Sequence, residues 1–345
     1  MVNKPPYTIT ERAADSLAKI VEVVTRLKYA TGFNRDIRLH RENRLRMIHA
    51  SLAIEGNSLS LGEVRTIIDG KIVAGGQAEI AEVKNAYVAY DRLMSFDPYA
   101  VKDFLKAHGL MMQGLIKEAG KFRGGDVGVF DGAVPVHIGA RPQFVPGLVA
   151  ELFAWARASS LHPALKSAVL HYEIETIHPF ADGNGRMGRL WQTLLLARWN
   201  PLFAWIPMES LLYRDRPGYY RAIEEARHDN DAAAFIEFTL AAVLHSIVEQ
   251  EKRQVEHYDE HYVEHYVGLS AAQRTLLCAM GNAELSRREL FDRLGIQGDS
   301  RAYRRHIEPL IAAGLIEMTR PDTPKSRLQK YRRTEKGRAV CGEIS

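Results

Sequence analysis

Cysteine, long apolar runs and a strong charge of one sign are all scarce in this sequence of 345 residues. Its two cysteines, Cys278 and Cys341, make no metal-binding or redox motif, and we do not expect them to form a disulfide. No apolar run approaches the roughly 20 residues that span a membrane, and the stretch MVNKPPYTIT lacks the apolar segment of a signal peptide. We therefore expect a cytoplasmic protein of ordinary globular composition that does not contact a membrane.

The small net charge of +4 is distributed unevenly along the chain. Residues 268–345 hold 15 Lys and Arg against 9 Asp and Glu, whereas the rest of the chain has a slight acidic excess. A basic surface can bind nucleic acid through its phosphates, so DNA is a candidate partner of 268–345. The charge imbalance alone is weak evidence for that partner.

The spacing of apolar residues predicts a protein built mainly of α-helices. The pattern predicts a helix over about 40–56, which ends there because Gly56 and Asn57 are residues that often follow a helix end. The predicted helices before residue 257 are 11–28, about 40–55, 61–70, 78–94, 100–119, 146–158, 162–177, 185–198, 217–228 and 231–256.

One segment, 122–144, breaks the helical pattern because it is rich in Gly, Val and Pro and has no helical period. We interpret it as a β-hairpin or flap. One strand of the hairpin is predicted to contain Pro135, Val136, His137 and Ile138.

The chain changes character after a charged linker at 257–267. Three short helical segments in 268–345 precede two predicted strands around a basic, proline-containing loop, which is the pattern of a winged helix-turn-helix domain. Its predicted recognition helix carries Arg301, Arg304 and Arg305. A winged helix can also serve only for dimerisation or contact with a partner protein, and the sequence leaves that alternative open.

The most informative stretch is HPFADGNGRMGR, residues 178–189. Gly183 and Gly185 let the backbone approach an anion where a helix begins and leaves its N–H groups unpaired. Asn184 tolerates a left-handed conformation and suits a helix cap. The stretch therefore predicts a cradle for phosphate.

Four side chains of the same stretch supply chemistry. Arg186 and Arg189 lie on one helix face, where a bound polyphosphate would relieve their repulsion. Asp182 supplies an oxygen for Mg²⁺, which commonly uses one or two carboxylates plus substrate phosphates. Histidine can accept a proton at neutral pH, which suits His178 to deprotonate an attacking hydroxyl. The set predicts phosphoryl or nucleotidyl transfer, and the missing Lys-Ser/Thr ending excludes a P-loop ATPase.

The stretch matches the Fic motif, HxFx(D/E)GNGRxxR, at every defined position, and the chain resembles the Fic family over roughly 100–250. Family members mostly transfer AMP from ATP to a Ser, Thr or Tyr hydroxyl of a target protein. The resemblance implies a Fic helical fold with His178 as general base, Asp182 as the Mg²⁺ ligand, and a flap that aligns the target by strand addition. The nucleotide-binding residues that it implies are Phe180, Ala181, Asp182, Gly183, Asn184, Gly185, Arg186 and Arg189.

An upstream stretch, SLAIEGN, fits the inhibitory motif (S/T)xxxE(G/N) of many Fic proteins with Ser51, Glu55 and Gly56. A carboxylate in the last turn of a helix is electrostatically misplaced unless a cation from another segment accompanies it. The resemblance implies that the cation is Arg189 and that Glu55 keeps it from holding the γ-phosphate of ATP. We therefore predict an ion pair between the two and an autoinhibited enzyme.

The sequence patterns and the resemblance together divide the chain into an N-terminal helical region with the inhibitory helix (1–99), a Fic core (100–256), the linker, and a winged-helix domain (268–345). It implies ATP and Mg²⁺ as cofactors and a target protein as partner, and it leaves self-modification and a homodimer open. One alternative is a Fic enzyme that uses another phosphate-containing donor or removes AMP from a modified target. Another is a DNA-binding regulator whose Fic body senses a nucleotide, against which the presence of His178 argues.

Overall fold

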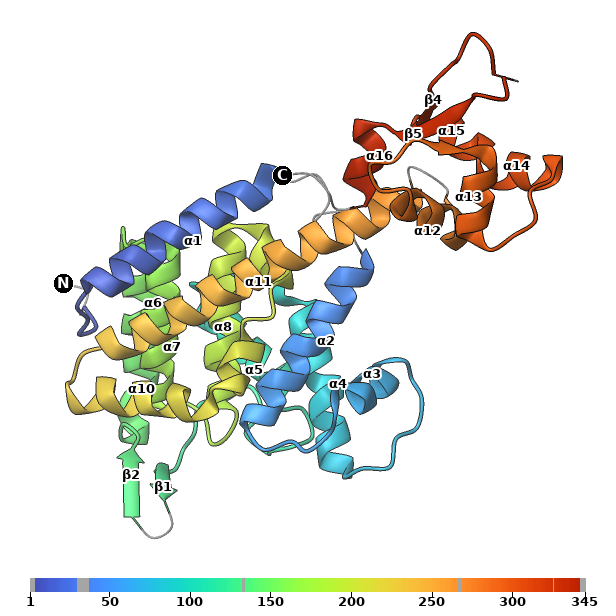
Figure 1. Cartoon of the computed structure of the whole chain (residues 1–345). Helices are drawn as coiled ribbons and strands as arrows, with labels where there is room; N and C mark the ends of the chain where they lie inside the picture. The colour runs from blue at the N-terminus through green and yellow to red at the C-terminus, as the bar shows by residue number, and fades with distance from the viewer. Residues whose placement is uncertain (1–3, 30–36, 132–133, 266–268, 325, 342–345) are drawn as a thin grey trace. The chain divides into compact units, whose positions relative to one another are not determined.

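The computed structural model describes residues 4–29, 37–131, 134–265, 269–324 and 326–341. The chain forms two compact units, Met1–Glu251 and Lys252–Ser345, each with its own hydrophobic core. Helices make up most of the first unit, and the second unit combines short helices with a small sheet (Figure 1). The expected mainly α fold is confirmed, whereas the boundary near residue 99 and the limits of the linker stay predictions.

The helices from Glu11 to His265 largely follow the predicted segments. They are α1 (Glu11–Tyr29), α2 (Ile37–Ile54), α3 (Leu61–Ile68), α4 (Gln77–Asp91), α5 (Val101–Met111), α6 (Val145–Ala158), α7 (Pro163–Ile177), α8 (Asn184–Trp199), α9 (Glu209–Arg214), α10 (Arg216–His228) and α11 (Ala233–His265), with 3-10 turns at Leu93–Ser95, Pro142–Phe144 and Pro201–Trp205. Of these helices, α1, α3, α5 and α10 carry a clear apolar stripe at helical spacing.

Two details of this prediction were wrong. The sequence pattern missed α9, which is too short to show a helical period. It also extended α5 to residue 119, whereas the helix ends at Met111 and turns follow. Gly114 and Gly120 adopt positive φ angles of 73° and 78°, which a continuing right-handed helix does not allow.

The centre of the first unit is the pair α7 and α8, which pack against each other (Figure 1). Every residue of α8 from Arg186 to Ala197 is buried, as expected for a helix surrounded by others. Gly188 permits the close approach, because a Cβ there would collide with the His171 ring of α7. The packing fixes the end of α7 beside the start of α8, where the motif loop joins them.

Helix α2, which precedes the predicted inhibitory Glu55, is part of the core. Its Leu45, Ile48 and Leu52 are at most 1% exposed. The helix packs against α4 and α9, and its buried Asn43 donates a hydrogen bond to Gln250 Oε1 at 3.0 Å. The end of α2 is therefore held firmly in place.

The predicted hairpin is present as β1 (Gly128–Asp131) and β2 (Val134–Ile138), which pair antiparallel. Pro135, Val136, His137 and Ile138 all lie in β2, as expected. The side chains of 129–138 lie outside the described part of the structure.

The second unit combines short helices with a small sheet, and its assignment as a winged helix stays a prediction. Its sheet has the strand order β3-β5-β4, with antiparallel pairing. The elements are α12 (Ala271–Ala279), β3 (Leu285–Ser286), α13 (Arg287–Leu294), α14 (Ser300–His306), α15 (Glu308–Ala312), β4 (Ile316–Met318), β5 (Lys330–Arg333) and α16 (Glu335–Val340).

The predicted recognition helix is divided into α14 and α15, with Ile307 between them and Pro309 in the first turn of α15. Proline cannot donate the backbone hydrogen bond that a continuous helix requires, which explains the break. Arg301, Arg304 and Arg305 are exposed on α14.

Cys278 and Cys341 form a disulfide, so the expectation that they would not was wrong. The two residues are 63 positions apart in sequence and belong to no motif, which hid their proximity. The fold brings their Cα atoms to 5.4 Å, within the range that a disulfide spans.

The stretch Ala233–Lys252 of α11 is long and apolar enough for a membrane span, with a mean hydropathy of 1.3, and half of it is buried in the protein. We expected no run that approaches this length, because scattered polar residues interrupt it in the sequence. Core helices pass the same test, so the stretch is weak evidence for a membrane.

Candidate active site

His178 lies at the C-terminal end of α7 with a left-handed backbone, φ 52° and ψ 61°. This conformation costs a residue with a side chain about 1–2 kcal/mol. Arg123 stabilises it, because its Nε donates to the His178 carbonyl at 2.7 Å and its backbone N–H donates to the Pro179 carbonyl at 3.1 Å. The backbone of the predicted base is thus fixed by a residue outside the motif.

The same arginine holds both ends of the flap. Its Nη1 donates to the Gly125 carbonyl at 2.8 Å and its Nη2 to the Ala140 carbonyl, and the residue is only 3% exposed. Burial lowers the pKa of Arg123. Gly139 leaves room for the guanidinium, since a Cβ there would lie 2.9 Å from Nη2. The sequence analysis missed Arg123 because a single arginine in a glycine-rich segment makes no motif.

Asn184 closes the motif loop from within. Its Oδ1 accepts from the Phe180 N–H and its Nδ2 donates to the Phe180 carbonyl, both at 2.9 Å. We expected Asn184 itself to take the left-handed cap position, but Gly183 takes it, with φ 87°. Asn184 is instead the first residue of α8, where its buried side chain can reach Phe180.

His108 of α5 supports the loop from below and was also missed. Its ring stacks on Phe180 at a centroid distance of 3.6 Å, its Nδ1 accepts from the Gly120 N–H, and its Nε2 lies 3.0 Å from the Asp182 carbonyl. Burial lowers the pKa of His108 to about 4, against the opposing hydrogen bond to Asp182. The ring is therefore neutral near pH 7, with its proton on Nε2 donated to Asp182.

The carboxylate of Asp182 faces solvent at the start of α8. Its Oδ1 accepts from the Gly183 N–H at 2.5 Å and from Arg186 Nη2 at 3.0 Å, and its side chain remains 57% exposed. The exposed Ala181 lies beside it in the loop. Within the described residues no group of three or more His, Cys, Asp or Glu could hold a metal. A single open carboxylate fits an ion that takes most of its ligands from phosphates.

Arg189 is wholly buried and is held by the predicted inhibitory segment. Its Nη2 donates to Glu55 Oε1 at 2.6 Å and to the Ser51 carbonyl at 2.9 Å, and its Nε donates to Ser51 Oγ at 3.1 Å. Burial acts to lower the pKa of Arg189, but the charge of Glu55 raises it above its ordinary value. The predicted ion pair is confirmed, although Glu55 lies just past α2 rather than in its last turn.

Two glycines make this contact geometrically feasible. A Cβ at Gly185 would collide with Glu55 Oε1 and lie 3.0 Å from Arg189 Nη1. Gly56 has φ 97°, in the region that favours glycine, and ends α2 so that the Asn57 N–H donates to the Leu52 carbonyl. Gly185 of the Fic motif and Gly56 of the inhibitory motif therefore both serve the same ion pair.

Arg186 is 3% exposed and contacts two carboxylates. Its Nη1 donates to Glu82 Oε1 at 2.9 Å and its Nη2 to Asp182 Oδ1 at 3.0 Å. Among the described residues, Arg186 Nε and Arg189 Nη1 are buried without a hydrogen-bond partner. An unmade hydrogen bond of a buried charged group is costly, so both arginines have capacity for an additional anion.

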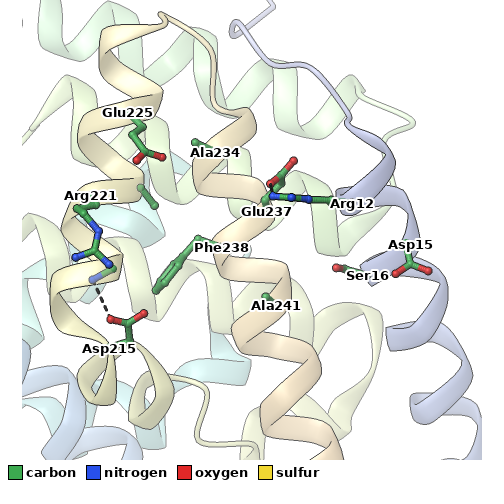
Figure 2. A pocket seen from close by; sticks show the side chains of 12 residues that line it. Arg12, Asp15, Ser16, Asp215, Arg221, Glu225, Ala234, Glu237, Phe238 and Ala241 are labelled. Carbon is green, nitrogen blue, oxygen red and sulfur yellow. Dashed lines mark hydrogen bonds and ion pairs between the residues drawn. The ribbon is translucent and has the colours of Figure 1, made fainter.

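A separate hollow of about 490 Å³ lies between α1, α10 and α11 (Figure 2). Two of its carboxylates have structural partners: Asp215 caps α10 by accepting from the Gly218 N–H, and Glu237 accepts from Thr10 Oγ1. The hollow contains none of the predicted site residues. Its charged lining residues are Arg12, Asp15, Asp215, Arg221, Glu225 and Glu237.

Two family profiles match the chain. The Fic/DOC family matches residues 96–196, and the C-terminal domain of Fic-like proteins (filamentation induced by cAMP) matches residues 273–334. Among curated proteins, protein adenylyltransferase Fic of Nematostella vectensis is 29% identical over 202 residues, 55% of this chain and 45% of that protein. That of Drosophila melanogaster is 28% identical over 242 residues, 67% of this chain and 46% of that protein. The chain spans less than half the length of these relatives.

Solved structures extend the similarity to almost the whole chain. Fic-1 (aa134–508) of C. elegans shares the fold with a TM-score of 0.61 at 23% identity, over 72% of this chain and 73% of that one. A Fic family protein from Desulfovibrio desulfuricans G20 is 39% identical with a TM-score of 0.72, over 96% of this chain and 99% of that one. With the motif loop in place and this match along both units, the chain belongs to the Fic family.

Proposed function

We propose that this protein transfers AMP from ATP to a Ser, Thr or Tyr hydroxyl of a target protein, and that Glu55 holds it in an inhibited state. The observation that carries the proposal is the assembled loop, with His178 at the end of α7 and the start of α8, which no side chain caps, next to Arg186 and Arg189. The names of the curated relatives support the same activity.

In this proposal His178 accepts the proton of the target hydroxyl while the hydroxyl oxygen bonds to the α-phosphorus of ATP. The bond from that phosphorus to the bridging oxygen breaks, and pyrophosphate leaves. The backbone at the start of α8 and Arg186 hold the α and β phosphates. Mg²⁺ bound at Asp182 would neutralise phosphate charge, and the backbone edge of β2 would pair with an extended target segment.

The inhibited state follows from competition for one guanidinium. Arg189 is the second arginine of the motif and would hold the γ-phosphate, but it donates to Glu55 and Ser51 instead. A carboxylate at this position also repels the phosphates, so ATP would bind without the geometry that transfer requires.

ATP labelled at the α-phosphate, added to cell lysate with purified protein, tests the proposal. We expect labelled target bands with Glu55→Gly, few with the wild type, and none with Glu55→Gly combined with His178→Ala. Label from another nucleoside triphosphate alone would favour a different donor. Loss of AMP from a pre-labelled target would favour the reverse activity.

The second unit supports a second candidate function, which is binding to duplex DNA. Arg301, Arg304 and Arg305 are exposed on α14, at the place of a recognition helix, and Arg320 and Arg327 are exposed on the loop between β4 and β5. Both surfaces could contact phosphates in a winged-helix arrangement. The alternative hypothesis is that this unit serves only for dimerisation or for contact with another protein.

A cytoplasmic location is also a proposal. The disulfide between Cys278 and Cys341 is the observation against it, because disulfides are rare in a reducing cytoplasm. Alkylation of free thiols in intact cells, followed by mass spectrometry of the peptides that hold the two cysteines, measures the fraction that is oxidised.

A further inference from the structure

Glu82 of α4 contacts the motif although it belongs to neither the Fic loop nor the inhibitory segment. Its Oε1 accepts from Arg186 Nη1 at 2.9 Å, and Arg186 donates through Nη2 to Asp182 Oδ1 at 3.0 Å. The three side chains differ in exposure: that of Arg186 is 4% exposed, that of Glu82 23%, and that of Asp182 57%. The guanidinium is thus a buried bridge between an inner and an outer carboxylate.

The positive charge of Arg186 needs the carboxylate of Glu82 as a partner. A buried guanidinium is destabilised unless carboxylates neutralise it. If Asp182 were its only partner, Arg186 would compete with a metal ion for the same carboxylate oxygens. With Glu82 on Nη1, the positive charge stays neutralised when Asp182 turns to a metal ion.

Glu82 is itself held in a fixed orientation. Its Oε2 accepts from Asn57 Nδ2 at 2.7 Å, so both of its oxygens have a donor. Asn57 is anchored in turn, since its Oδ1 accepts from the Leu59 N–H at 3.1 Å and its own N–H donates to the Leu52 carbonyl. A carboxylate with both oxygens bonded presents Oε1 to Arg186 in one geometry.

The contact leaves Arg186 able to bind phosphate. Its Nη1 and Nη2 are occupied, but its buried Nε has no hydrogen-bond partner among the described residues. Nε can therefore donate to a phosphate oxygen without displacing Glu82. For this reason we do not interpret Glu82 as a second inhibitory acid that competes with the nucleotide.

We propose that Glu82 is a positioning residue for the metal and phosphate site: it neutralises Arg186 so that Asp182 is free to bind the metal ion that accompanies ATP. The inference rests on the proposed function, because it assumes a nucleotide with a divalent cation at this loop. Partners that hold metal ligands in position typically change metal affinity by about 10–100-fold when they are mutated.

The test compares Glu82→Gln with a matched control in the Glu55→Gly background. Glutamine keeps the size of Glu82 and removes its charge. The control is Glu79→Gln, one turn earlier on α4, whose carboxylate accepts hydrogen bonds from Ser58 and from the backbone of Gly76 rather than from Arg186. Mn²⁺ serves as the probe, with bound and free ion measured by electron paramagnetic resonance at saturating ATP. Calorimetry measures ATP binding in the presence of EDTA.

We expect Glu82→Gln to raise the Mn²⁺ concentration for half-saturation by about tenfold, with ATP affinity in EDTA within about twofold of the parent. Glu79→Gln should match the parent in both measurements. An unchanged Mn²⁺ titration with only a lower melting temperature would show a merely structural role and overturn the inference. Tighter ATP binding in Glu82→Gln would also overturn it, in favour of competition. If the Glu55→Gly parent binds no Mn²⁺ with ATP, the proposed function itself fails.

Discussion

Arg189 Nη2 and Glu55 Oε1 lie 2.6 Å apart, although 134 positions separate the two residues in the sequence. The arginine is wholly buried, whereas the glutamate side chain is 33% exposed. Removing one partner of a buried pair leaves the other charge without compensation, which makes the remaining arginine a strong site for a new anion. The proposed inhibition and the proposed binding of the γ-phosphate would therefore use the same guanidinium.

We predict that Glu55→Gly raises AMP transfer sharply over the wild type, because Arg189 becomes available to the γ-phosphate. Glu55→Asp should raise it less, since its carboxylate is one methylene shorter but keeps its charge near Arg189. Incorporation of label from α-labelled ATP at saturating Mg²⁺ measures the difference. Equal rates in the wild type and Glu55→Gly would mean that the ion pair does not restrain the enzyme.

A double variant separates two effects: freeing Arg189 from Glu55, and the use of Arg189 in catalysis. Arg189→Ala should not be active, and Glu55→Gly with Arg189→Ala should stay inactive, because the cation that Glu55 occupies is the one that the γ-phosphate needs. A double variant as active as Glu55→Gly would exclude Arg189 from phosphate binding.

A second prediction concerns the proposed base. In the Glu55→Gly background, His178→Ala should lower transfer by about 10²–10⁴-fold, the usual effect of removing a general base. ATP affinity by calorimetry should change little, because the phosphate site is built from the backbone of α8 and from arginines. Transfer at the parent rate would remove His178 from the mechanism.

The sequence predicted most helices of the first unit and the flap from local patterns, and the ion pair from two motifs with fixed spacing. Apolar spacing encodes α1, α3 and α10, and the glycines at 56 and 185 mark where the chain must turn or approach closely. The pairing of Glu55 with Arg189 followed from the family resemblance, since nothing local connects the two residues.

The residues that support the loop could not be predicted in the same way. Arg123, His108 and Glu82 act through contacts with segments 55 to 104 positions away in sequence. Each is an ordinary residue for its local context, so only the packing of α4, α5 and the flap against the loop shows its role. The disulfide was missed for the same reason.

A third prediction tests the link between the flap and the base. In the Glu55→Gly background, Arg123→Lys should lower transfer to the target by about 10²-fold, the effect of a misplacement of roughly 1 Å, because one ammonium cannot replace the guanidinium at the Gly125, Ala140 and His178 carbonyls. ATP affinity should be retained. Arg141→Lys, an exposed neighbour of the flap, is the control and should match the parent. Unchanged transfer in Arg123→Lys would mean that the flap and His178 keep their geometry without it.

A fourth prediction concerns the pH dependence of stability. The pKa of His108 is lowered from 6.5 to about 4 by burial, so the unfolded chain binds a proton below pH 6.5 that the folded protein does not bind until about pH 4. The free energy of unfolding therefore has its full value, as far as His108 is concerned, above pH 6.5. It falls by roughly 3 kcal/mol in total as the pH is lowered to 4. Glu209, whose pKa burial raises to about 7, opposes this slope, so the wild type alone is not informative.

The measurement is the difference in unfolding free energy between the wild type and His108→Gln, by urea titration at several pH values. Glutamine keeps an N–H for the Asp182 carbonyl and does not titrate. The advantage of the wild type should shrink steadily from pH 6.5 to 4.5. A constant difference over this range would contradict the neutral, buried state of His108.

The last prediction concerns DNA. If α14 and the loop between β4 and β5 contact phosphates, affinity of the full chain for a duplex should fall steeply with salt, since each neutralised phosphate contributes about 0.9 to the slope of log K against log salt. Arg304→Glu with Arg305→Glu should weaken binding and lower that slope by about 2. Fluorescence anisotropy with a labelled duplex measures both. The control is Arg338→Glu, an exposed arginine on α16, which changes the net charge but not α14. An equal loss of duplex affinity in the control would mean that net charge alone explains the effect. Absence of duplex binding at low salt would favour protein contact as the role of this unit.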